Sequence, residues 1–371
     1  MTSVSREAFL HVLESVAPGL SPREIVEQSA CVVFRGGRAC TYNDEVSCRA
    51  PSGLPKEVEG AVQAEPLLAL LRKLPEENVT VEAAAGRLTV AGKGRRAWFR
   101  LEAEVVLPVD QVERPKRWTP LPPEFAEAVA VVGQCAGTDE SQTACVCVHV
   151  TPDWVEASDN VQACRWRLKT GVSQPTLVRQ TSLKHVVSAG ATELAETDQW
   201  LHFRNPRGLI LSCRRYLDDY PALGKFLKAE GAAAALPPGL ADAVDRANDF
   251  SKELKDANYV LVDLRPGKVA VAGEGVNGGY REVKKLPSYK GEPLAFYVAP
   301  SILQDLVQKH RECVVAPERL KVDGGHYTYV TCLLTPEERN GAAGAAGEEG
   351  EAAEVPPKKK RKEPAAAEAD E

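Results

Sequence analysis

The sequence predicts an α+β fold made of three repeated units, each with two helices packed on antiparallel sheets. The first observation is an order of helix, hairpin, helix and hairpin that occurs three times within residues 1–335. The second is constant spacing: 116 and 114 residues separate the first turns, at Gly37, Asp153 and Gly267. The later turns are 122 and 117 residues apart, at Gly86, Gly208 and Gly325. A period of about 112 residues indicates repeated domains rather than a solenoid of short units. We expect domains at 1–115, 116–232 and 233–335, followed by a tail over 336–371.

The first repeat begins with a helix over residues 4–16, where apolar residues such as Phe9 and Leu13 recur at helical spacing. ACVVF (30–34) is a strand, RGG a turn and residues 38–50 the returning strand. A short helix is expected over 64–75, and strands with glycine turns over 78–101. The stretch FRGGRACTYNDEVSC (34–48) gathers cysteines and charges at its turn, but its counterparts share only its shape. We therefore interpret it as a hairpin and not as a catalytic loop.

The other two repeats follow the same order. In the second, helices are expected over 121–136 and 180–190, with hairpins over 144–168 and 199–215. In the third, the expected helices are 237–257 and 299–310, and the hairpins are 259–275 and 319–334.

Composition and charge exclude several classes of function. No apolar run approaches the roughly 20 residues of a membrane span. The N-terminal segment has charges inside its apolar pattern, so we interpret it as an amphipathic helix and not a signal peptide. The chain has a net charge of −6, of which the tail contributes −4 through ten acidic and six basic residues. Residues 1–335 thus have a net charge of only about −2, which is not typical of a sequence-specific DNA-binding protein.

Two motifs could indicate bound metal or cofactor, and neither is favoured. Cys145, Cys147 and His149 alternate and would share one face of a strand, but a metal site needs further ligands at suitable spacing. GEGVNG (273–278) matches G-x-G-x-x-G, yet the segment after it is short, charged and interrupted by proline rather than helical. The ten cysteines form no CxxC pair and are expected to be reduced. No Walker loop, HExxH or GxSxG occurs, so we expect no metal, no cofactor and no catalysis.

The tail is expected to be disordered, because few apolar side chains remain to offset its ordering entropy. It contains one compact basic run: Lys358, Lys359, Lys360, Arg361 and Lys362. The run is similar to a monopartite nuclear localisation signal, and it is equally consistent with a solvated charge block.

Four local stretches, in this order and spacing, resemble a known family. They are GGRACTYNDEVS in the first repeat, VEASDNVQA and YLDDYP in the second, and HYTYVTCLL at the end of the third. Over residues 1–335 the chain resembles the bacterial-type sliding clamps, the beta subunits of DNA polymerase III, including phage-encoded ones. It departs from them at Asn160, Val161 and Gln162, where the family has Gly-His-Arg, and in its long tail.

The resemblance implies a ring of two chains with six clamp domains, in which helices line the hole and sheets form the outside. Such a homodimer would encircle duplex DNA without sequence preference and tether a replicative DNA polymerase, as a non-catalytic processivity factor. A separate clamp loader would open the ring. The expected location is the cytoplasm of a bacterium or phage-infected host, or the nucleus if the basic run acts as a localisation signal.

The resemblance also implies two sets of site residues. The residues expected to face DNA are basic residues on or near the helices: Arg6, Arg23, Arg72, Lys73, Arg179, Lys184, Arg246, Lys252, Lys309 and Arg311. Basic residues also favour helix C-termini because of the helix dipole, so each has a structural alternative. The groove for a partner peptide would be formed by Ala157, Ser158, Val161, Ala163, Pro221, Val330, Thr331, Cys332, Leu333 and Leu334. The alternative for these is ordinary strand packing.

Two alternatives remain for the assembly. The chain could keep the clamp fold without encircling DNA and act as a scaffold or DNA-associated interaction protein. A trimeric ring is a further variant, although three domains per chain favour a dimer with six.

Overall fold

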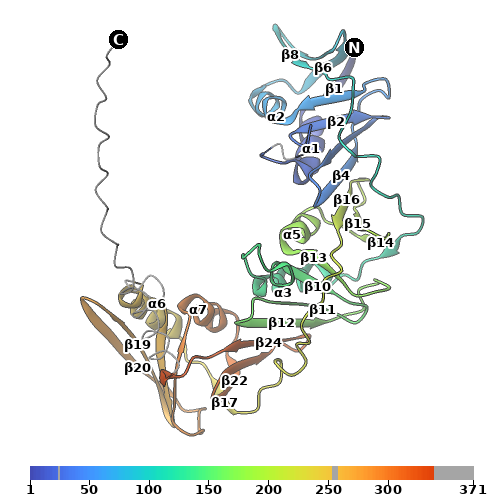
Figure 1. Cartoon of the computed structure of the whole chain (residues 1–371). Helices are drawn as coiled ribbons and strands as arrows, with labels where there is room; N and C mark the ends of the chain where they lie inside the picture. Colours follow the sequence, from blue (N-terminus) through green and yellow to red (C-terminus); the bar gives the residue numbers. More distant parts are fainter. Residues whose placement is uncertain (24–25, 253–257, 338–371) are drawn as a thin grey trace, which may run out of the picture. The chain divides into compact units, whose positions relative to one another are not determined.

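The computed structural model (Figure 1) describes residues 1–23, 26–252 and 258–337. The chain divides into two compact units. Unit 1 comprises Met1–Glu230, Glu312–Val315 and Arg319–Cys332. Unit 2 comprises Gly231–Arg311, Ala316–Glu318 and the chain from Leu333 onward. The expected helix over 237–257 and the tail both extend beyond the described residues, and the basic run of the tail lies outside them.

The same order of elements occurs three times along the chain. The first set is β1 (Thr2–Ser5), α1 (Arg6–Val16), β2 (Cys31–Arg35), β3 (Arg38–Tyr42), β4 (Val46–Pro51), β5 (Gly60–Gln63), α2 (Ala64–Lys73), β6 (Asn78–Ala84), β7 (Arg87–Gly92) and β8 (Arg95–Arg100). The second is β9 (Thr119–Pro120), α3 (Phe125–Val132), the short α4 (Thr143–Val146), β10 (Cys147–Val150), β11 (Trp154–Ser158), β12 (Gln162–Arg167), β13 (Thr176–Arg179), α5 (Gln180–Ser188), β14 (Glu193–Glu196), β15 (Trp200–Arg204) and β16 (Ile210–Arg214).

The third set is β17 (Ala232–Ala235), α6 (Leu240–Ser251), β18 (Val260–Arg265), β19 (Gly267–Gly275), β20 (Gly278–Leu286), β21 (Leu294–Val298), α7 (Pro300–Lys309), β22 (Glu312–Ala316), β23 (Arg319–Asp323) and β24 (Tyr327–Cys332). The predicted repeat is therefore confirmed in its order of elements. The domain boundaries at 115 and 232 stay a prediction.

Two antiparallel junctions join consecutive repeats within unit 1. Strand β4 pairs with β16, giving one continuous sheet in the order β5-β2-β3-β4-β16-β15-β14-β9. Strand β12 pairs with β24 in the same way, so that β13-β10-β11-β12 continue into β24-β23. In each case the third strand after a repeat's first helix pairs with the last strand of the next repeat. Sheet β1-β6-β7-β8 completes the first repeat.

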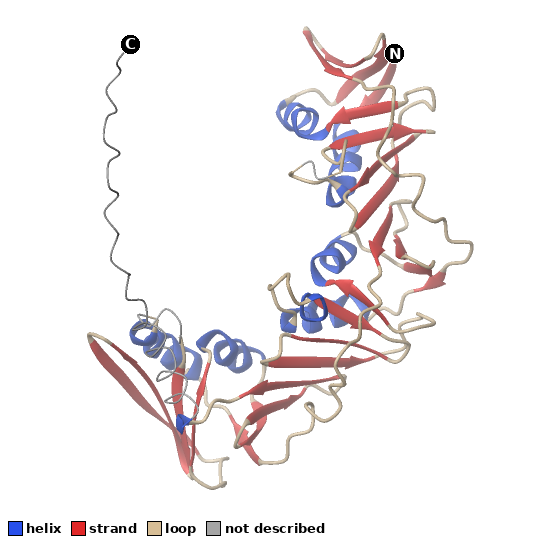
Figure 2. Ribbon diagram, viewed as in Figure 1, coloured by secondary structure: helices blue, strands red, loops and turns tan. Residues whose placement is uncertain are grey.

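The helices form where apolar residues line one face. Helix α1 is capped by the Ser5 side chain, which accepts a hydrogen bond from the backbone N–H of Ala8, and it buries Phe9, Leu13 and Val16. Within unit 1, α1, α2, α3 and α5 lie on the same side of the sheets (Figure 2). Within unit 2, α6 packs on α7 and on the sheet β20-β19-β18-β21. No described helix is long and apolar enough to cross a membrane.

The structure corrects three predictions of the sequence analysis. The returning strand expected over 38–50 is two strands, because Asn43 and Asp44 turn the chain; Asp44 has φ 74° and the Asn43 side chain accepts from the N–H of Val46 at 2.8 Å. Cys145 lies in α4 and not on a strand with Cys147 and His149. Nine of the described strands lie outside the expected hairpins and were not predicted: β1, β5, β9, β13, β14, β17, β20, β21 and β22.

The third correction concerns the later turns. Gly86 joins β6 to β7, whereas Gly208 and Gly325 lie between the last two strands of their repeats. The matching residue of the first repeat is Gly94, between β7 and β8, which brings the spacings to 114 and 117 residues. All three have φ between 72° and 82°, a left-handed conformation that favours glycine.

Candidate nucleic-acid interface

The helices of unit 1 present a mixed and weakly charged surface. Its five described α-helices contain four acidic and four basic side chains. Helices α6 and α7 of unit 2 contain four acidic and two basic side chains. Phosphate binding without sequence preference depends on Lys and Arg. Any contact between this helix layer and DNA would therefore be weak, and would depend on where the free basic groups lie.

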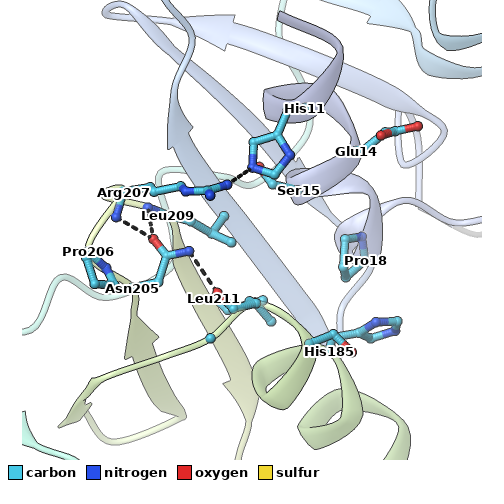
Figure 3. A pocket seen from close by; sticks show the side chains of 13 residues that line it. His11, Glu14, Ser15, Pro18, His185, Asn205, Pro206, Arg207, Leu209 and Leu211 are labelled. Carbon is cyan, nitrogen blue, oxygen red and sulfur yellow. Dashed lines mark hydrogen bonds between the residues drawn. The ribbon is translucent and has the colours of Figure 1, made fainter. Parts of the chain in front are cut away.

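One hollow on this layer is built from two consecutive repeats (Figure 3). It has a volume of about 560 Å³ and lies between α1, the C-terminal end of α5 and the turn that joins β15 to β16. Helix α1 contributes His11 and Glu14, α5 contributes His185, and the turn contributes Asn205 and Arg207.

Hydrogen bonds hold the turn in place. The Asn205 side-chain oxygen accepts from the backbone N–H of Arg207 at 3.0 Å and of Leu209 at 3.1 Å, and its amide donates to the carbonyl of Ala189 at 2.9 Å. The fixed turn points Arg207 at α1, where its Nη1 donates to Nε2 of His11 at 2.5 Å (Figure 3). An imidazole nitrogen that accepts from a guanidinium carries no proton, so this contact belongs to neutral His11.

The other groups around the hollow are less positive than their residue types suggest. Glu14 is paired with Arg72 at 3.0 Å. Burial lowers the pKa of His185 below its ordinary value, which favours the neutral ring. Arg207 is thus the permanent cation of the hollow, and the sequence analysis did not include it or His11. The sequence contained one signal for Arg207: it is a basic residue directly before the turn glycine Gly208.

The structure places the ten residues expected to face DNA in three situations. Four are exposed and form no ion pair with a described residue: Arg23, Lys73, Lys184 and Arg311. Four are exposed or half-exposed and paired with a carboxylate of their own or a neighbouring element: Arg72 with Glu14, Arg246 with Glu282, Lys252 with Asp249, and Lys309 with Asp305. In each pair the carboxylate offsets part of the charge that the cation could present to phosphate.

The last two residues are engaged inside the protein. Arg6 donates to the backbone carbonyls of Glu76 at 3.0 Å and Leu71 at 3.1 Å, which ties α1 to the end of α2. Arg179 lies between Glu45 at 2.8 Å and Glu140, and donates to the Tyr216 hydroxyl at 3.2 Å. Only 19% of its side chain is exposed. These contacts account for both arginines without DNA.

The residues expected in the peptide groove lie around the β12–β24 junction. Ala163 pairs with Val330, and both are fully buried beneath Leu223 and Leu227. The chain itself therefore covers this part of the junction. Ala157, Ser158 and Thr331 are also buried, Cys332 is half-buried, and Val161 and Pro221 are exposed.

The remaining two groove candidates belong to unit 2. Leu333 is buried and its N–H donates to the carbonyl of Glu318. Leu334 is half-buried and exchanges backbone hydrogen bonds with Tyr297 at 2.7 and 3.0 Å. Strand packing accounts for both contacts.

No group of three or more His, Cys, Asp or Glu in the described residues is arranged to hold a metal ion. His149 instead hydrogen-bonds Glu156 at 2.8 Å and packs on Tyr220. GEGVNG forms the turn between β19 and β20, and the segment directly after it is strand β20, which the sequence analysis did not predict.

Comparison with known proteins supports the fold alone. No protein family and no curated protein matches the sequence. Among solved structures, the chain is similar to the DnaN sliding clamp from Bartonella birtlesii bound to griselimycin, with a TM-score of 0.80 and 12% identity over 90% of this chain and 98% of that one. It is similar to the DNA polymerase sliding clamp from Bacillus subtilis (TM-score 0.75, 13% identity, 90% and 98% covered). It is also similar to a putative DNA polymerase III beta subunit from Eubacterium rectale (TM-score 0.75, 15% identity, 90% and 98% covered). The chain has the sliding-clamp fold.

Proposed function

We propose that this chain is a DNA sliding clamp: two copies close into a ring around duplex DNA and tether a DNA polymerase, without catalysing a reaction. The observation that carries the proposal is the strand junction that occurs twice in unit 1, at β4–β16 and β12–β24. At both junctions the third strand after a repeat's first helix pairs with the last strand of the next repeat. The equivalent third strand of the third repeat, β20, and the last strand of the first repeat, β8, both lie at sheet edges. A third junction between β20 of one copy and β8 of the next would close a head-to-tail ring and remove both edges.

The β4–β16 and β12–β24 junctions predict the register of the proposed β8–β20 junction. In β4, Pro51 pairs with Arg38, and Ser47 lies four residues before Pro51. Ser47 pairs across the junction with Ser212, which lies four residues after the turn residue Gly208. The matching residue of β20 is Arg281, four residues before Lys285, the partner of Lys268. The matching residue of β8 is Trp98, four residues after Gly94. At β12–β24 the equivalent residue, Ala163, lies four residues before Arg167, the partner of Trp154, and pairs with Val330, five residues after Gly325. The two junctions together place Arg281 of one copy opposite Trp98 or Phe99 of the other.

The exposure of these edges supports the pairing. Trp98 is 60% exposed and Val283, two residues from Arg281, is 57% exposed, although both are large and apolar. Arg87 already lies 4.5 Å from the centre of the Trp98 ring, so the ring accepts a cation on one face. Exposed apolar groups on a strand edge are typical of a surface that is covered in an assembly.

A second candidate function is a scaffold that has the clamp fold and does not encircle DNA. The observation that favours it is that no set of described helices has a basic excess: those of unit 1 are balanced, and α6 and α7 have four acidic against two basic side chains. In either case the polymerase and clamp loader stay proposed partners, and the cytoplasm the proposed location.

Two measurements on the full chain decide between the candidates. Light scattering gives the mass, and retention on circular and linearised plasmid, with a clamp loader present, tests encirclement. A mass near twice 40.1 kDa with retention only on circular DNA supports the clamp. A monomer, or equal retention on both plasmids, contradicts the ring and leaves the scaffold.

A further inference from the structure

Three arginines crowd one face of the first hairpin, on the side of the sheet away from the helices. Arg35 of β2 and Arg38 of β3 are directly opposite each other. Arg49 of β4 is diagonal to Arg38, because Arg38 pairs with Pro51. Like charges directly opposite on a sheet are destabilising. A structural role for this cluster would need carboxylates to match it.

The segment after β8 folds over the same face and adds a fourth arginine. Leu107, Val109 and Val112 pack against Cys40 and Tyr42 of β3. This packing anchors the segment, and the Arg49 guanidinium donates to the carbonyl of Val109 at 2.8 Å. Arg114 follows and lies beside the hairpin.

Two small adjoining cavities remain between the segment and the sheet. Their volumes are about 220 and 250 Å³. Arg38, Arg49 and Arg114 line both cavities, and Arg35 lines the smaller one. Drug-sized ligands take larger pockets, of about 300–1,000 Å³, so these cavities suit a small group.

The carboxylates at the site do not balance the arginines. Asp110 lies 2.5 Å from Arg35 and 3.6 Å from Arg114. Glu113 accepts from the backbone N–H of Gln199 at 3.3 Å. Within the described chain Arg38 forms no ion pair. Four guanidinium groups against two carboxylates leave an excess of two positive charges.

We propose that the two cavities form one binding site for the dianionic phosphate of a phosphomonoester. Guanidinium groups match phosphate oxygens with paired hydrogen bonds, and several arginines from different strands can do so at once. A monoester carries up to two negative charges near neutral pH, which equals the excess of the site. A phosphodiester carries one, so the internal phosphates of a DNA strand fit less well. The site faces away from the helices and does not depend on the proposed clamp function.

Calorimetric titration of the full chain with inorganic phosphate at pH 8 tests the site, with dimethyl phosphate as the diester probe. We expect saturable binding of phosphate at or below about 10 mM, and binding of dimethyl phosphate that is at least about tenfold weaker. O-phosphoserine and adenosine 5′-monophosphate then distinguish a peptide from a nucleotide source by which of them binds more tightly.

Arg38→Gln is the decisive variant, because this side chain is exposed and its loss breaks no ion pair. We expect about tenfold weaker phosphate binding. Arg117→Gln is the matched control, since Arg117 lies on the same segment, is exposed and lines neither cavity, and it should bind as the natural chain does. Absence of saturation in the natural chain, or equal loss in both variants, would overturn the proposal.

Discussion

Replacing Trp98 by alanine tests the proposed β8–β20 interface most directly. A tryptophan side chain presents about 250 Å², and 60% exposure leaves about 150 Å² to be covered by a second copy. At about 25 cal/mol per Å², full burial would contribute at most about 4 kcal/mol. Since alanine keeps part of this surface and closure is not complete, we expect a loss of about 2–3 kcal/mol per interface.

A ring has two such interfaces, so the loss for the dimer doubles. The dimer dissociation constant should rise about 10³- to 10⁴-fold. Sedimentation over a range of concentrations measures it. Leu217→Ala is the control, because Leu217 is 79% exposed and lies on neither edge strand. A dissociation constant that W98A changes no more than L217A would refute the burial of Trp98 between the copies, and a monomeric natural chain would refute the interface itself.

Three further predictions concern charge and protonation. Strand β8 has three arginines, and β20 has three basic residues against one acidic residue, so the two edges repel each other. Added salt screens this repulsion and should tighten the dimer, which sedimentation at rising NaCl measures. Weaker association would contradict the like-charge interface. Burial lowers the pKa of His202 from 6.5 to about 4. The free energy of unfolding therefore has its full value above pH 6.5 and falls by up to about 3 kcal/mol as the pH drops to 4, because the unfolded chain binds the proton more readily. Urea unfolding of His202→Asn should show a shallower loss over this window than that of His326→Asn, whose natural side chain is exposed, and equal slopes would exclude the buried imidazole as the cause. Arg179→Ala should destabilise unit 1 by about 1–2 kcal/mol in urea, because it leaves Glu45 unpaired but 37% exposed to water, which screens the charge. Arg179→Lys should lose less, and equal losses would mean that the charge does not matter.

Apolar periodicity carried most of the fold prediction. Helices α2, α5 and α7 lie where the sequence places them, because each buries one apolar face whose spacing depends only on helix geometry. The errors arose at turns and at the strands that precede the helices, such as β1 and β21. Asn43 and Asp44 turn the chain through side-chain hydrogen bonds that a strand pattern does not include.

The candidate sites were predicted less completely, because a site depends on which elements meet. Arg207 and His11 are 196 residues apart and form a hydrogen bond only because β4 pairs with β16. Arg179 has the composition of a DNA-binding residue, yet its position between Glu45 and Glu140 gives it an internal role. Basic residues on helices indicate phosphate binding only after their ion pairs are known.

Three features could be predicted from the sequence: the α+β class, the threefold order of helices and hairpins, and the near-neutral charge of residues 1–335. These follow from local patterns: apolar spacing, turn residues and composition are properties of short segments. Only the tertiary structure decided that the repeats join through β4–β16 and β12–β24, that β8 and β20 remain at sheet edges, and that four arginines meet beside the segment after β8. Strand pairs and ion pairs form between residues that are far apart in the chain. The packing of whole sheets decides which residues meet, and no neighbouring residue in the sequence indicates it.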